Sequence, residues 1–156
     1  MATNRPKIFL DADVIFAGSA APSTQGASYV ILLMGEITLL DCFTSAQVMT
    51  EVERNLTNKL PNALAEFHLL AKRCLTVVSD PKVIDLHNFD GQADPKDLPI
   101  LVAAIQANCS HLITFNTRHF TPTGDQIIIQ RPGEFLQHVR GQLRLLSNAE
   151  EWSDSL

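Results

Sequence analysis

Three acidic residues, Asp11, Glu51 and Asp97, are spaced so that a parallel sheet would bring them together. Asp11 follows an apolar strand, Glu51 lies in the helix after the second strand, and Asp97 opens a helix that leads to a later strand. Three carboxylates at the carboxyl edge of one sheet repel one another and raise a pKa unless a cation binds. Oxygen ligands of this kind suit Mg²⁺ or Mn²⁺ rather than zinc, and such ions activate water for phosphodiester hydrolysis.

The clearest of these signals is Asp11, at the end of the short apolar run Lys7–Leu10. Such runs are typical of buried strands, and open α/β sheets bind ligands at the carboxyl ends of their strands. An unpaired carboxylate there is costly, so the position favours a metal or a basic substrate. Asp11 could instead cap the turn or helix that follows it. Asp13 fits a metal site and a turn equally well.

The other acidic residues also have purely structural explanations. Glu51 could be a solvated helix residue that pairs with Arg54 or Asn55. Asp97 could interact only with the positive end of its helix dipole, and Asp94 could be the helix N-cap. The residues alone therefore leave open whether these acids bind a metal or only stabilise helices.

The histidine and cysteine residues give no separate metal signal. Neither CxxC nor a zinc-type Cys/His spacing occurs, and the cysteines are odd in number and lie mostly in apolar runs. We interpret them as reduced core thiols of a cytoplasmic protein, and four of the histidines as structural or solvated. The residues concerned are Cys42, Cys74, Cys109, His68, His87, His111 and His138.

Apolar strands and amphipathic helices alternate along the chain. This alternation predicts an α/β fold, specifically a three-layer α/β/α sandwich with a central, mostly parallel sheet. The sheet is the element that would position the acidic residues, because its carboxyl edge collects them. Strands are expected over Lys7–Leu10, Thr38–Phe43, Leu75–Val78, His111–Thr114 and Gln126–Gln130.

The helices are predicted from caps, prolines and apolar residues at helical intervals. We expect residues 80–92 to be irregular, residues 1–144 to form a single domain and residues 145–156 to form an acidic C-terminal tail. Helices are expected over Ala27–Met34, from a cap at Thr44 or Ser45 to about Leu60, from Pro61, from Asp94 to about Ala107, and from Pro132.

The composition limits the partners of the protein. The net charge is −5 and the basic residues are dispersed, whereas proteins that bind nucleic acid usually carry a basic stripe. An acidic nuclease is still consistent, because bound cations neutralise metal-binding carboxylates and a second subunit could complete a groove for RNA. No apolar run reaches the roughly 20 residues of a membrane span, and the N-terminus lacks the apolar core of a signal peptide.

Five segments of the chain, in order and in spacing, resemble the PIN-domain family, and especially its compact bacterial members such as VapC-type toxins. The resemblance covers roughly residues 7 to 137. No single segment is specific, but the five together in this order are. They are Phe9–Ile15, Thr50–Val52, Asp94–Ala104, Leu112–Phe120 and Arg131–Leu136.

The resemblance implies a site as well as a fold. By this match Asp11, Glu51 and Asp97 are acidic ligands of Mg²⁺ or Mn²⁺, and Thr114 is a polar residue that supports them. Asn116 belongs to the same catalytic set, but it stands where the family commonly has a fourth acid. An asparagine offers a carbonyl ligand without the charge.

Two further positions depart from the family. His119 stands where an acid is often found, and Asp13 stands where asparagine is frequent. The loss of acids at Asn116 and His119 predicts a weaker second metal position, with low activity or a need for Mn²⁺. Asp13 could partly compensate.

The function implied is a metal-dependent endoribonuclease that hydrolyses phosphodiester bonds of single-stranded or structured RNA. As a VapC-type member it would be the toxin of a toxin–antitoxin pair, with a small antitoxin protein as partner. Dimerisation is also implied, and a homodimer could supply the basic groove that one subunit lacks.

Two other functions compete with this one. The chain could be a catalytically weak or inactive PIN-fold module that binds RNA or protein, given Asn116 and His119. It could also be a haloacid-dehalogenase-like phosphatase, in which Asp11 forms an aspartyl-phosphate and Asp13 acts as acid/base. That phosphatase needs a late strand ending in paired aspartates, whereas the late strands here end in Thr114 and Gln130.

Overall fold

A five-stranded, fully parallel sheet forms the centre of the protein, in a computed structural model that describes residues 4–20 and 26–147. The spatial order is β3-β2-β1-β4-β5, so the earliest strand lies in the middle. The predicted sandwich with a parallel sheet is confirmed. The strands are β1 Lys7–Leu10, β2 Asp41–Ser45, β3 Leu75–Val78, β4 His111–Ile113 and β5 Ile128–Gln130.

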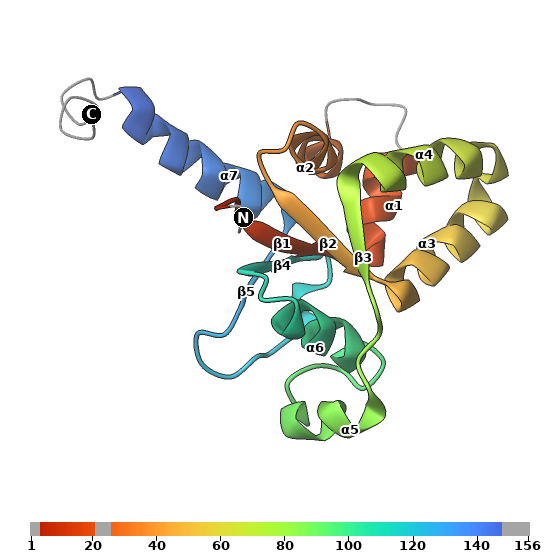
Figure 1. Ribbon diagram of the computed structural model, residues 1–156, viewed down its shortest axis with the longest axis vertical. Coiled ribbons are helices and arrows are strands. Elements are labelled where there is room, and N and C mark those ends of the chain that lie inside the picture. The colour runs from red at the N-terminus through yellow and green to blue at the C-terminus, as the bar shows by residue number, and fades with distance from the viewer. Residues whose placement is uncertain (1–3, 21–25, 148–156) are drawn as a thin grey trace.

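Helices cover both faces of this sheet. Figure 1 shows α1, α2 and α4 on one side and α5 and α6 on the other. None of the helices in the described ranges is long and apolar enough to cross a membrane. The α-helices are α1 Ala12–Ala20, α2 Ala27–Glu36, α3 Ala46–Lys59, α4 Leu64–Cys74, α5 Val83–Leu86, α6 Leu98–Gln106 and α7 Pro132–Leu143. Single 3₁₀ turns occupy Pro61–Ala63, His87–Phe89, Thr117–His119 and Arg144–Ser147.

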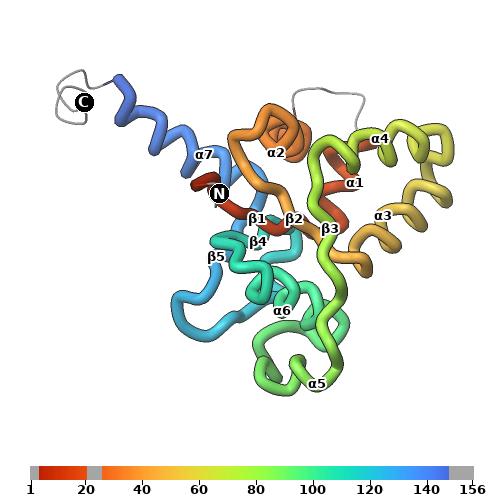
Figure 2. Tube along the Cα trace, viewed as in Figure 1, coloured from red at the N-terminus to blue at the C-terminus, as the bar shows by residue number. Residues whose placement is uncertain are grey.

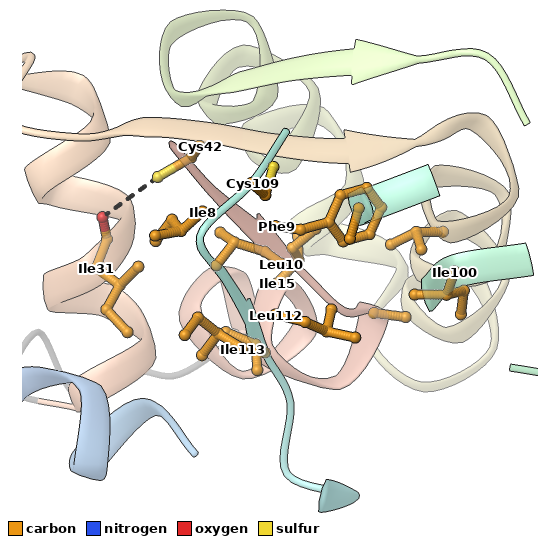
Figure 3. Packing of buried hydrophobic residues seen from close by; sticks show 14 of the residues in the cluster. Ile8, Phe9, Leu10, Ile15, Ile31, Cys42, Ile100, Cys109, Leu112 and Ile113 are labelled. Atoms are coloured by element: carbon orange, nitrogen blue, oxygen red, sulfur yellow. Dashed lines mark hydrogen bonds between the residues drawn. The ribbon is translucent and has the colours of Figure 1, made fainter. Parts of the chain in front are cut away.

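The core is built around β1, whose apolar residues are fully buried. Because successive side chains of a strand point to opposite faces, β1 packs against both helical layers. Figure 3 shows Ile8 on the side of Ile31 from α2, and Phe9 on the side of Ile100 from α6. Burying one such side chain contributes about 1.5–3 kcal/mol. This packing fixes the position of the residue that follows β1.

Strand register places the functional candidates side by side. Leu10 of β1 is aligned with Ile113 of β4, and the backbone N–H of Asp11 donates to the Ile113 carbonyl at 3.0 Å. Asp11 and Thr114 therefore leave adjacent strands at the same height. The predicted cap of α3 is also present, since the Ser45 hydroxyl accepts a hydrogen bond from the Val48 N–H at 3.4 Å.

Some predicted boundaries were wrong. The strand expected over Thr38–Phe43 begins only at Asp41, because Thr38 has a φ of 65° and belongs to the turn after α2. The helix expected from Asp94 begins at Leu98, after a turn in which the Asp97 N–H donates to the Asp94 carbonyl. The segment expected to be irregular contains α5 and a 3₁₀ turn.

The C-terminal end is only partly described. Helix α7 leads away from the sheet, as Figure 2 shows, and is followed by the turn Arg144–Ser147. The predicted acidic tail lies mostly outside the described residues, which end at 147. The division into a domain and a tail therefore stays a prediction.

Candidate metal centre

Asp11 lies at the centre of the candidate site, between the end of β1 and the start of α1. Its side chain is 7% exposed and accepts two hydrogen bonds. The Ala12 N–H donates to Oδ1 at 2.7 Å, and the Thr114 hydroxyl donates to Oδ2 at 2.8 Å. Asp11 thus directly precedes α1, with its side chain bonded to the first N–H of the helix, whereas a side-chain cap bonds the second or third, and it is also held by a residue 103 positions away.

The charge on Asp11 is strongly disfavoured without a cation. Burial, the Asp13 carboxylate and, to a smaller extent, the Asp97 carboxylate raise the pKa of Asp11, which is about 7 overall. The hydrogen bonds from Thr114 and Ala12 oppose this shift but do not cancel it. A bound cation would stabilise the ionised form that burial and the neighbouring acids destabilise.

The loop after β4 forms the second wall of the site. Thr114 is fully buried, and its hydroxyl both donates to Asp11 and accepts from the Asn116 N–H at 3.0 Å. Asn116 uses its side-chain amide to donate to Asp13 Oδ2 at 3.2 Å. Asn116, which stands where the family commonly has an acid, therefore helps to position the Asp13 carboxylate.

Asp13 is held from one side only. Its Oδ2 accepts from the Phe115 N–H at 3.1 Å and from the Asn116 amide. Its Oδ1 is buried and has no hydrogen-bond partner among the described residues. Burial raises the pKa of Asp13, hydrogen bonds from backbone N–H groups lower it, and the Glu51 carboxylate raises it again.

Asp97 is brought to the same edge by the turn before α6. Its Oδ2 lies 2.9 Å from Nδ1 of His119, and its side chain is 15% exposed. Asp94 Oδ2 lies 3.7 Å from the same nitrogen. These three residues offer ligand atoms within 4.8 Å of one another.

Glu51 projects from α3 toward the same group of acids. It is partly buried, and among the described residues no side-chain hydrogen bond or ion pair joins it to Arg54 or Asn55. Its carboxylate contributes to the raised pKa of Asp13. The local pairing considered from the sequence is therefore absent among the described residues.

The residues fit a hard divalent cation. The donors are carboxylate oxygens, one of which, Asp13 Oδ1, is buried without a partner among the described residues, and Mg²⁺ and Mn²⁺ prefer such oxygens. The electrostatic links join Asp11 to Asp13 and Asp97, and Asp13 to Glu51. Asp11 and Asp97 are therefore electrostatic neighbours, and Glu51 is linked to them through Asp13. The group whose ligand atoms lie within 4.8 Å of one another among the described residues is Asp94, Asp97 and His119, so the three acids predicted from the sequence stay a prediction as a ligand set.

The sequence alone does not decide the role of two residues beside these acids. Asp13 fits a metal site and a turn equally well, and His119 is recognisable only as a departure from the family. Their contacts to Asn116 and Asp97 depend on loops that meet in space. The only signal in the sequence was that both positions differ from the usual residue.

A parallel α/β/α fold with acids at the carboxyl edge defines a broad class of α/β proteins with many activities, so the fold alone identifies neither a family nor a function. The family is given by a model for the PIN domain, which matches residues 7–118. The chain belongs to the PIN-domain family, whose members are generally nucleases, and the resemblance stated from its segments is confirmed.

A solved structure shares the fold. The crystal structure of VapBC2 from Rickettsia felis bound to a DNA fragment from their promoter matches with a TM-score of 0.59. The identity is 16%, and the match covers 80% of this chain and 98% of that chain. No curated protein matches the chain. The phosphatase alternative finds no support in these comparisons.

Proposed function

We propose that the protein is a Mg²⁺- or Mn²⁺-dependent endoribonuclease whose metal ligands are Asp11, Glu51 and Asp97. The observation that carries this proposal is buried Asp11 at the carboxyl edge of the sheet, whose pKa is raised to about 7 with contributions from the Asp13 and Asp97 carboxylates. Such a group of carboxylates is costly without a cation. Membership in a family of nucleases supports the reaction class.

The bound ion would supply a nucleophilic water and stabilise charge on the phosphodiester. The chain's own residues prepare this chemistry. Thr114 orients the Asp11 carboxylate at 2.8 Å, and Asn116 and the Phe115 N–H orient Asp13. The rigid end of β1 holds these groups, so the ligands need little reorganisation when the substrate binds.

An exposed aromatic ring supports single-stranded RNA as the substrate. Phe115 is 42% exposed although it lies between Thr114 and Asn116, and its backbone N–H is fixed by Asp13 at 3.1 Å. Aromatic side chains of this kind stack on bases, and only unpaired bases have free faces. Stacking also lessens the need for the basic stripe that the chain lacks.

We further propose that the protein is a toxin whose partner is a small antitoxin. The support is its VapC-type resemblance and the shared fold of the VapBC2 structure. A homodimer is part of this proposal, and the exposed leucines at the end of α7 and beyond it are suitable for such contacts. They are Leu143, Leu145 and Leu146, each more than half exposed. The three buried free thiols fit a reducing compartment such as the cytoplasm.

The test is cleavage of end-labelled single-stranded RNA by the purified protein with Mg²⁺ or Mn²⁺. We expect metal-dependent cleavage that is lost in Asp11→Asn and in Asp97→Asn. Cleavage by Asp97→Asn at the parent's rate would show that the site assignment is wrong.

The non-catalytic module is the competing function, favoured by the missing fourth acid at Asn116. It predicts neither cleavage nor metal binding. Calorimetric titration with Mn²⁺ separates the two: binding without cleavage indicates a wrong substrate or a missing partner, whereas the absence of both favours the module.

A further inference from the structure

Two loops far apart in the sequence are joined beside the acidic cluster. The loop before α6 and the loop after β4 exchange backbone hydrogen bonds, from the Asp94 N–H to the His119 carbonyl at 2.9 Å and from the Thr121 N–H to the Gln92 carbonyl at 2.7 Å. A short antiparallel bridge lies between these bonds. The imidazole of His119 is thereby held next to the acids of the other loop.

One imidazole nitrogen faces two carboxylates. Nδ1 of His119 lies 2.9 Å from Asp97 Oδ2 and 3.7 Å from Asp94 Oδ2. A neutral imidazole carries at most one proton on this nitrogen, so it can satisfy one of the two oxygens. The shorter distance, 2.9 Å between His119 Nδ1 and Asp97 Oδ2, is the distance expected between two adjacent ligand atoms that each lie about 2.1 Å from the same ion.

We propose that His119 Nδ1, together with Asp97 and Asp94, binds a divalent transition-metal ion, and that the imidazole makes this position prefer Mn²⁺ to Mg²⁺. The proposal rests on the metal-dependent function, because Asp97 is shared with the acidic site. Imidazole is a good ligand for transition metals, whereas Mg²⁺ prefers oxygen and keeps its water. The same substitution that removes a family acid thus sets the choice of ion.

The same contacts of His119 are also consistent with a role in which the imidazole does not bind the metal. The imidazole could donate its Nδ1 proton to Asp97 and only orient that carboxylate. The two functions differ in one measurable property, which is whether nitrogen is bonded directly to the metal.

The experiment is electron spin-echo spectroscopy of the full chain loaded with Mn²⁺, which detects a ligating ¹⁴N nucleus. We expect nitrogen coupling in the parent and its loss in His119→Asp, which restores an acid. The matched control is His68→Asp, because His68 Nε2 also contacts a carboxylate, Glu53, at 3.2 Å outside the site. Nitrogen coupling should persist in this control.

Calorimetry supplies a second readout. The ratio of Mn²⁺ affinity to Mg²⁺ affinity should fall about tenfold or more in His119→Asp. Mutations of residues around a metal commonly change metal affinity by this amount. Mn²⁺ that binds the parent without nitrogen coupling would overturn the proposal for His119 and leave the acidic site standing. A parent that binds no Mn²⁺ would overturn both.

Discussion

The carboxyl edge and the amino edge of the sheet are formed by opposite ends of the same strands, but they carry different side chains. At the carboxyl edge, β1 and β4 are followed by Asp11 and Thr114, which are joined by a hydrogen bond. At the amino edge, β4 begins with His111 beside an apolar pocket of about 350 Å³. That pocket is lined mainly by Pro6, Met34, Leu39, Leu40, Phe135 and Val139. Carboxylates gather at the carboxyl edge, whereas the amino edge holds this apolar pocket and an ion pair of Arg5 with Asp41, 3.2 Å apart.

Each edge contains buried polar atoms without a hydrogen-bond partner among the described residues, and one atom from each edge shows that such atoms differ in meaning. At the carboxyl edge the atom is Asp13 Oδ1, which has Asp11 and Glu51 as electrostatic neighbours. At the amino edge it is His111 Nε2, which lies among apolar side chains. An unpartnered atom indicates a ligand where other donors converge, and a cost to stability where none do.

The largest expected effect comes from removing a carboxylate that has no structural partner. Glu51→Gln should lower cleavage by about 10²–10³-fold, the usual loss when one group that stabilises charge in the transition state is removed. Its free energy of unfolding should change little, because Glu51 makes no side-chain hydrogen bond or ion pair in the described part of the chain. Single-turnover cleavage and urea denaturation measure the two quantities.

The control for this variant lies on the same helix. Glu53 contacts His68 at 3.2 Å, away from the acids, so Glu53→Gln should keep cleavage within about twofold of the parent. Equal losses in both variants would mean that the chemistry is not confined to the carboxyl edge.

The fold was readable from the sequence because apolar strands alternate with capped helices. The run Lys7–Leu10 was predicted with correct bounds, since a buried central strand needs a continuous apolar segment. Thr38 was wrongly predicted to lie in a strand. Its φ of 65° places it in a turn, and a β-branched residue is uncommon in that conformation, so the sequence favours a strand there. The alternation of strands and helices over the whole chain still predicts the fold correctly when a single boundary is wrong.

The site was predictable only in part. Asp11 follows β1, Asp97 precedes α6 and Glu51 lies in the first half of α3, and parallel strands align such positions whatever their separation in sequence. The contact of His119 with Asp97 has another origin, since it depends on hydrogen bonds between two irregular loops. Periodicity carries no information about how such loops meet.

The next effect is a pH dependence confined to the carboxyl edge. The pKa of Asp11 is about 7 in the folded protein, whereas the ordinary value for an aspartate, which applies to the unfolded chain, is 3.8. Between these values the unfolded state has lost its proton while the folded state keeps it, so stability falls as pH rises. Without metal, the parent should lose about 2–3 kcal/mol between pH 5 and pH 8 through this group.

Asp11→Asn isolates that contribution, because other groups titrate in both proteins. Urea denaturation in the presence of a chelator should show a flatter pH dependence for the variant. Added Mn²⁺ should reverse the trend in the parent, since the ion binds the ionised carboxylate. Identical pH profiles for parent and variant would contradict the raised pKa.

A smaller effect is expected where the family's acid is missing. In Asn116→Asp, an amide that donates to Asp13 Oδ2 at 3.2 Å becomes a second carboxylate. The metal-free protein should lose about 1 kcal/mol of stability from this repulsion, while Mn²⁺ affinity rises about tenfold. Calorimetry and denaturation of the variant measure these opposite changes.

The matched control is Asn58→Asp. Asn58 is exposed on α3, so this variant adds the same negative charge as Asn116→Asp but without a contact to the site. It should alter neither quantity. A stability loss in Asn116→Asp without a gain in Mn²⁺ affinity would mean that Asn116 only positions Asp13.

The smallest effect belongs to the amino edge. Burial and the neighbouring His138 lower the pKa of His111, so the ring is neutral at pH 7 and gains nothing from its charge. His111→Phe keeps an aromatic ring against Phe135, 5.3 Å away, removes the unpartnered Nε2 and also removes the contact of Nδ1 with the Ser110 hydroxyl at 2.8 Å. These changes oppose each other, so the free energy of unfolding of the variant should change by less than about 1 kcal/mol and the variant should cleave RNA like the parent. A loss of cleavage would show that the two edges are coupled, because His111 begins β4 and Thr114 follows its last residue, Ile113.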